Sequence, residues 1–125
     1  MIKAIAIDDE ILALKIIETF ASKVEGISLE KTFHKQSDAE KYLRKFPVDL
    51  IFMDIQMPNK NGLDFYKSLS QDVKVIFTTA FSEYAVDAFD VNAIDYLVKP
   101  FSFDRFQKAV DKLALKSSTE LQSQH

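Results

Sequence analysis

The sequence predicts an α/β protein with a doubly wound parallel sheet, and two observations support this fold class. Patterns typical of strands and helices alternate five times along the 125 residues, and parallel strands need a crossover segment that is usually a helix. The first apolar run is almost continuous, as in strands buried on both faces of a parallel sheet. A chain of this length can bury one apolar core, so we expect a single domain.

The first strand and helix are followed by a predicted edge strand. The run Ile2–Ile7 is rich in Ile and ends at Asp8, which is typical of a buried strand. Apolar residues recur every three or four positions over Ile11–Val24, the spacing of an amphipathic helix, and Gly26 ends this pattern. Apolar and polar residues alternate in Ile27–Phe33, so we expect a strand with one wetter face there.

The middle of the chain predicts a helix, a strand and a shorter helix. Ser37–Glu40 has the sequence of a capping box, which would begin the second helix, and Pro47 ends that helix. Val48–Met53, which is apolar except for Asp49, predicts the third strand. Turn residues over Pro58–Gly62 predict a loop, and Leu63–Leu69 after it has the pattern of a short helix.

The remaining chain predicts two more strands and two more helices. Val73–Thr78 and Ile94–Val98 have the composition of strands, and a weaker helical pattern, Glu83–Phe89, lies between them. Ser102 is the expected cap of the fifth helix. Residues Lys116–His125 are polar and show no period, so we expect a frayed tail or the start of a linker there.

Composition excludes several classes of function. The chain has no Cys and only two His, His34 and His125, which excludes cysteine nucleophiles and sites of the structural zinc, haem or iron–sulfur type. Its 16 Lys and Arg against 19 Asp and Glu give a net charge of −3, so we expect no direct contact with nucleic acid. The apolar runs are too short for a signal peptide or a membrane span. We therefore expect a cytoplasmic protein without membrane contact.

Residues that can bind a metal ion or a phosphate collect where four predicted strands end. They are Asp8 and Asp9 after the first strand, Asp54 after the third, Thr79 after the fourth and Lys99 after the fifth. In an open parallel sheet the carboxyl ends of the strands form one edge, and ligands bind there. Each residue alone has an ordinary explanation, such as a helix-dipole partner, a turn former, a cap or a surface lysine. Four strand ends with complementary residue types favour a functional site.

Clustered carboxylates repel one another and raise each other's pKa, and a divalent cation relieves this repulsion. Carboxylate oxygens suit Mg²⁺ or Mn²⁺, and Mg²⁺ in proteins is commonly shared between one or two carboxylates and phosphate oxygens. The sequence therefore predicts a site that holds a phosphoryl group beside a metal ion.

Four segments together resemble the receiver domain of two-component response regulators. They are Asp8 with Asp9, Asp54–Pro58 followed by Asn61 and Gly62, Thr79 with Ala80, and Tyr96–Phe101. The resemblance covers residues 1–115 and implies a flavodoxin-like fold, with a five-stranded parallel sheet in the order 2-1-3-4-5 and five helices.

The stretch Phe77–Ala85, with Tyr96–Phe101, is similar to receivers of the LytTR type. That similarity implies a DNA-binding output domain, for which residues 116–125 would begin the linker. It also implies transcription regulation through that domain rather than through the receiver.

The resemblance implies that Asp54 is the phosphoacceptor and takes a phosphoryl group from a sensor histidine kinase. It implies that Asp9 binds Mg²⁺ directly and Asp8 through water, with Asp54 and the backbone carbonyl of Gln56 completing the protein ligands. Lys99 would form a salt bridge to the phosphoryl group. The domain would be a signalling module that assists its own phosphorylation and dephosphorylation, not an enzyme.

The implied switch begins when Thr79 donates its hydroxyl to the phosphoryl group and moves inward. Tyr96 would then rotate from an exposed to a buried position and change the surface formed by helix four, strand five and helix five. A phosphorylation-dependent homodimer through that surface is a further expectation. The peptide bond between Lys99 and Pro100 is expected to be cis.

Two alternatives belong to other classes. A Mg²⁺-dependent phosphatase could process free substrates through an aspartyl-phosphate, but such enzymes commonly place a second acid two residues after the nucleophile, where this chain has Gln56. A degenerate receiver could act only as a protein-binding module, but Asp9, Asp54, Thr79 and Lys99 are all present.

Overall fold

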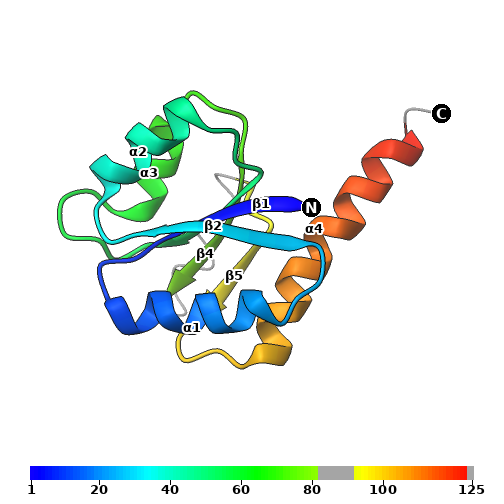
Figure 1. Ribbon diagram of the computed structural model, residues 1–125, viewed down its shortest axis with the longest axis horizontal. Helices are drawn as coiled ribbons and strands as arrows, with labels where there is room; N and C mark the ends of the chain where they lie inside the picture. The colour runs from blue at the N-terminus through cyan, green and yellow to red at the C-terminus, as the bar shows by residue number, and fades with distance from the viewer. Residues whose placement is uncertain (82–91, 124–125) are drawn as a thin grey trace.

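A computed structural model describes residues 1–81 and 92–123, and its centre is a five-stranded sheet (Figure 1). The strands lie in the order β2-β1-β3-β4-β5, and all four neighbouring pairs are parallel. This confirms the predicted α/β class and strand order. The strands are β1 (Ile2–Ile7), β2 (Ile27–Phe33), β3 (Leu50–Asp54), β4 (Lys74–Thr79) and β5 (Asp95–Val98).

In the described part of the chain, two helices cover each face of the sheet (Figure 1). One face carries α1 (Ile11–Ser22) and α4 (Phe103–Ser123), and the other carries α2 (Gln36–Lys45) and α3 (Gly62–Ser68). Among the helices in the described part of the chain, none is both long and apolar enough to cross a membrane. The helix expected over Glu83–Phe89 lies outside the described residues.

Side chains along the central strands point alternately to the two faces of the sheet, which explains why the core has two halves. In β1, Ala4 and Ala6 pack under α1 and α4, while Ile5 and Ile7 pack under α2 and α3. Successive side chains of a strand point to opposite faces, and both faces are covered, so these four residues are fully buried. The continuous apolar run in the sequence is the consequence.

The second helix does not begin at a capping box. Its N-cap is Lys35, in an extended conformation and without a side-chain capping hydrogen bond, so the prediction for Ser37–Glu40 is wrong. The Ala39 N–H donates to the Lys35 carbonyl at 3.3 Å. The first turn is therefore closed before Ser37 could act as a cap.

The last helix is longer than its sequence pattern indicates. α4 continues to Ser123, so residues 116–123 are helical rather than a frayed tail, and Figure 1 shows this end of α4 projecting beyond the sheet. No Gly or Pro follows Pro100 in the sequence, and without such a residue nothing local ends a helix. The domain boundary at residue 115 stays a prediction.

Candidate functional site

The ladder of the sheet places the predicted site residues at one edge. Asp54 and Thr79 are the last residues of β3 and β4. Asp54 pairs in register with Thr78, and Thr79 pairs with Val98. The backbone N–H of Lys99 donates to the Thr79 carbonyl at 2.7 Å. The register therefore brings Asp54, Thr79 and Lys99 to the same end of three adjacent strands.

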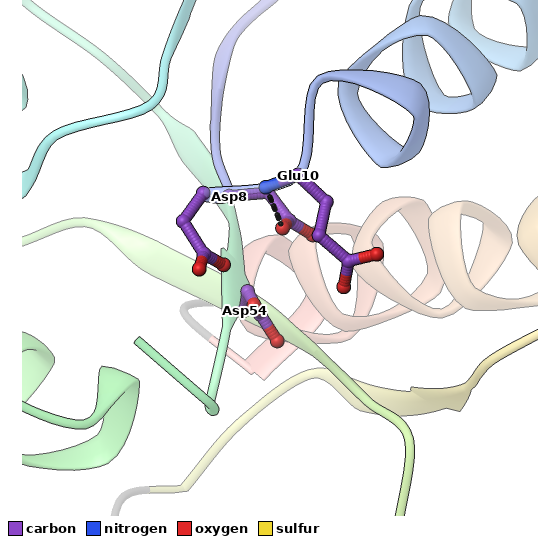
Figure 2. A group of neighbouring side chains, drawn as sticks. Asp8, Glu10 and Asp54 are labelled. Carbon is purple, nitrogen blue, oxygen red and sulfur yellow. Dashed lines mark hydrogen bonds between the residues drawn. The ribbon is translucent and has the colours of Figure 1, made fainter. Parts of the chain in front are cut away.

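Four carboxylates gather at this edge. Oxygens of Asp8, Asp9, Glu10 and Asp54 lie within 4.8 Å of one another, and Figure 2 shows three of them where β1 and β3 end. Asp8 and Asp54 are buried, whereas Asp9 and Glu10 are exposed. The Glu10 N–H donates to Asp8 Oδ1 at 2.9 Å. Glu10 was not among the predicted site residues, although it directly follows the acidic pair.

Lys99 supplies the positive charge of the site. Its Nζ lies 2.8 Å from Asp8 Oδ2, 3.5 Å from Glu10 Oε1 and 3.6 Å from Asp54 Oδ1. Burial alone would lower the pKa of Lys99, but the hydrogen bond to Asp8 and the surrounding carboxylates raise it. Lys99 therefore stays protonated, and one ammonium faces more than one carboxylate.

The pKa of Asp54 is raised from 3.8 to about 7. Burial is the main cause and the charge of Asp8 the next, while Lys99 and the Gln56 N–H, 3.2 Å from Asp54 Oδ1, act in the opposite direction. Near neutral pH the charge on this carboxylate is therefore only partly compensated by the protein. Oxygen ligands with uncompensated negative charge are the donor set that Mg²⁺ prefers.

The hydroxyl of Thr79 is turned toward Gln56 and the residues after β4. Gln56 Nε2 donates to Thr79 Oγ1 at 2.7 Å, and the Phe81 N–H donates to the same oxygen at 3.0 Å. Gln56 Oε1 accepts from the Ala80 N–H at 3.1 Å. From the sequence, a metal-binding role was assigned to the backbone carbonyl of Gln56, and its amide was noted where phosphatases have a second acid. The contacts of that amide with Thr79 and Ala80 were missed, and no local motif indicates them.

The role of Gly62 beside the site was also missed. A Cβ atom at this position would lie 2.3 Å from the Asp54 carbonyl oxygen and 3.0 Å from Ile55 Cα. The Gly62 N–H also donates to the Ile55 carbonyl at 2.8 Å. The loop after β3 therefore lies against the backbone of Asp54 and leaves no room for a side chain.

Tyr96 differs from the exposed position expected before phosphorylation. Its side chain is buried, with its ring centroid 5.5 Å from that of Phe77. Arg105 donates to the Tyr96 carbonyl at 2.9 Å and forms two hydrogen bonds with Asp95. These contacts tie β5 to α4. The peptide bond between Lys99 and Pro100 is cis.

Comparison with known proteins identifies a family that this chain matches. Residues 4–111 match the family model described as the response regulator receiver domain. The transcriptional regulatory protein NatR of Bacillus subtilis is 35% identical over 123 residues, which cover 96% of this chain and 52% of NatR. The sensory transduction protein LytR of Streptococcus agalactiae is 35% identical over 116 residues, covering 89% of this chain and 47% of LytR. The chain thus spans about half the length of these curated relatives.

A solved structure agrees with these matches. The response regulator protein TrrA of Thermotoga maritima, in complex with Mg²⁺ and BeF, is 30% identical with a TM-score of 0.77, and the match covers 90% of this chain and 99% of TrrA. The acidic pair, the aspartate that ends β3 and the lysine after β5 lie at one edge of the same fold. The chain belongs to the response regulator receiver domain family.

Proposed function

We propose that Asp54 accepts a phosphoryl group from a sensor histidine kinase and that this modification switches the domain. The observation that carries the proposal is the buried Asp54 carboxylate, which lies beside a second buried acid, Asp8, and 3.6 Å from the Lys99 ammonium. A buried carboxyl group is nucleophilic only in its ionised form, which a nearby positive charge favours. Lys99 compensates part of that charge.

The acidic cluster fits a divalent cation, Mg²⁺ or Mn²⁺. Asp9 is exposed and would bind the ion directly, Asp8 through water, and Asp54 with the backbone carbonyl of Gln56 would supply the remaining protein oxygens. When bound, Mg²⁺ would screen the Asp54 carboxylate from the incoming phosphoryl anion. The raised pKa of Asp54 supports this assignment, because burial and then the charge of Asp8 disfavour the ionised carboxylate, and a bound cation would offset both effects.

In the transfer step, a carboxylate oxygen of Asp54 attacks the phosphorus atom of a phosphohistidine. An O–P bond forms as the P–N bond breaks, and the electron pair of the broken bond stays on the imidazole nitrogen, which takes up a proton. Lys99 pairs with one phosphoryl oxygen and Thr79 donates its hydroxyl to another. The product is an acyl phosphate on this chain.

The surface beside the site supports a protein donor. Ile11, Leu12 and Ile16 of α1 are exposed, with exposed fractions of 63%, 74% and 46%. Leu12 and Ile16 line a groove of about 360 Å³ that Glu10 and Lys99 border. Contiguous exposed apolar side chains mark protein-binding surfaces. A donor with an apolar face could therefore dock on α1 and present its phosphohistidine to Asp54.

The proposed readout is the surface around β5 and α4, which would control a LytTR-type DNA-binding output domain. The names of the relatives NatR and LytR, a transcriptional regulatory and a sensory transduction protein, support this role. The receiver itself would contact no DNA and would dimerise when phosphorylated. The proposal places the domain in the cytoplasm, where it would assist its own phosphorylation and dephosphorylation.

Incubation with acetyl phosphate, with and without Mg²⁺, tests the proposal. Intact-mass spectrometry should show one phosphoryl group that requires Mg²⁺ and decays after acetyl phosphate is removed. Asp54→Asn is the matched control, because it keeps the size of the side chain and removes the nucleophilic oxygen. Sustained release of phosphate at many turnovers would instead indicate a phosphatase. Absence of labelling would indicate a protein-binding module.

A further inference from the structure

Gln56 connects the proposed phosphoacceptor with the proposed switch. Its backbone N–H donates to Asp54 Oδ1 at 3.2 Å, and its side chain reaches across to the end of β4. There the amide contacts two consecutive residues in opposite senses, donating to Thr79 Oγ1 at 2.7 Å and accepting from the Ala80 N–H at 3.1 Å. One residue thus contacts both parts of the site.

The hydrogen-bonding capacity of the Thr79 hydroxyl is fully used. A threonine hydroxyl has one proton and two acceptor positions. Thr79 Oγ1 accepts from Gln56 Nε2 and from the Phe81 N–H, and it donates to the Phe81 carbonyl at 3.3 Å. To donate to a phosphoryl oxygen, the hydroxyl must redirect its proton. To move toward Asp54, it must leave the Gln56 amide.

We propose that the Gln56 side chain is a latch that holds Thr79 and Ala80 in the resting position and opens when Asp54 carries a phosphoryl group. The inference rests on the proposed role of Asp54. An amide neither takes nor gives a proton at neutral pH, so Gln56 is a positioning residue. Its latch lowers the affinity of the domain for a phosphoryl group, because part of that binding free energy is used to open it.

Hydrogen exchange in the unphosphorylated protein tests the resting contact. Ala80 is exposed, so protection of its amide depends on the bond to Gln56 Oε1. Gln56→Met keeps the length of the side chain but removes both hydrogen bonds. The Ala80 amide should then exchange about 5–10-fold faster, whereas the Lys99 amide, bonded to the Thr79 carbonyl, should keep its rate.

Gln71→Met is the matched control. Gln71 lies in the loop between α3 and β4, so this substitution makes the same chemical change away from the site. It should leave exchange at Ala80 unchanged. An unchanged Ala80 rate in Gln56→Met would overturn the proposal, since the amide would then be protected by something other than Gln56.

Binding of beryllofluoride in excess Mg²⁺ tests whether the Gln56 latch lowers the affinity of the domain for a phosphoryl group. Calorimetric titration should show about 5–10-fold tighter binding to Gln56→Met than to the wild type, and no change for Gln71→Met. Equal or weaker binding by Gln56→Met would refute the latch. Failure of the proposed function gives a different result: Asp54→Asn would bind beryllofluoride as well as the wild type, whatever the exchange rate at Ala80.

Discussion

Lys99 Nζ lies 2.8 Å from Asp8 Oδ2 and 3.6 Å from Asp54 Oδ1, so the ammonium is held more closely by Asp8 than by the proposed phosphoacceptor. Both acids are buried, and the Lys99 side chain is 19% exposed. A small movement of the Lys99 ammonium would therefore exchange its closest partner from Asp8 to Asp54. A phosphoryl group on Asp54 would present a stronger acceptor for Lys99 than the carboxylate does.

The first prediction concerns stability against pH in the metal-free protein. The folded-state pKa of Asp54, about 7, exceeds its usual value of 3.8, so between these pH values the native state holds a proton that the unfolded state has released. The free energy of unfolding should therefore fall as pH rises from about 4 to about 7, by about 4 kcal/mol from this group. Below pH 4 and above pH 7 the group adds no further slope.

Asp54→Asn checks this sign. Urea denaturation in a chelating buffer should show that the variant is the more stable protein at pH 8 and loses its advantage toward pH 4. A constant difference between the two proteins over this range would contradict the raised pKa of Asp54.

The second prediction separates the two members of the acidic pair. Asp9 is exposed and proposed as a direct metal ligand, whereas Asp8 is buried and paired with Lys99. Asp9→Ala should therefore abolish Mg²⁺-dependent labelling by acetyl phosphate more completely than Asp8→Ala. Urea midpoints of both variants show whether each one is folded. Equal labelling of the two would refute the direct role of Asp9.

The third prediction concerns Gly62. Gly62→Ala should cost about 1–3 kcal/mol of stability and weaken beryllofluoride binding, because the new Cβ would displace the Asp54 carbonyl. Gly26→Ala is an informative control, since Gly26 has φ +91° and a methyl group there would meet no other atom within 4 Å. Backbone strain should destabilise that variant by about 1 kcal/mol. Its beryllofluoride affinity should stay that of the wild type.

The strands were predictable because their pattern is local. Four of the five strand patterns end at or next to a polar site residue, and Asp8, Thr79 and Lys99 lie at the ends of strands as predicted. The parallel arrangement then follows from the alternation of strands and helices. It brings residues more than 90 positions apart into contact, such as Lys99 and Asp8.

The missed features depend on contacts between distant segments. The Gln56 amide bonds residues 23 and 24 positions away, and the constraint on Gly62 comes from the backbone of Asp54. Neither contact leaves a periodic or motif-like signal. The extent of α4 was missed for a different reason. Its last residues are helical but mostly polar, so they lack the apolar residues at helical spacing from which a helix is predicted.

The last prediction uses Lys99→Ala to separate phosphorylation from switching. In the metal-free protein, loss of the ammonium should raise the pKa of Asp54 further, because Lys99 now lowers it. With Mg²⁺ in excess we expect acetyl phosphate to label the variant, though more slowly. In the proposed mechanism, however, a contact between Lys99 and the phosphoryl group would select the active conformation, and the variant lacks that contact. Dimerisation with beryllofluoride should therefore be lost.

Sedimentation velocity with and without beryllofluoride measures this loss. Lys45→Ala, which removes an exposed lysine from α2 on the opposite face of the sheet from α4, is the matched control and should dimerise as the wild type does. If Lys99→Ala binds beryllofluoride and still dimerises, Lys99 serves only to compensate the charge of Asp8 and Asp54. If it is labelled but stays monomeric, the partner exchange of Lys99 from Asp8 to the phosphoryl group is the step that couples chemistry to the surface around β5 and α4.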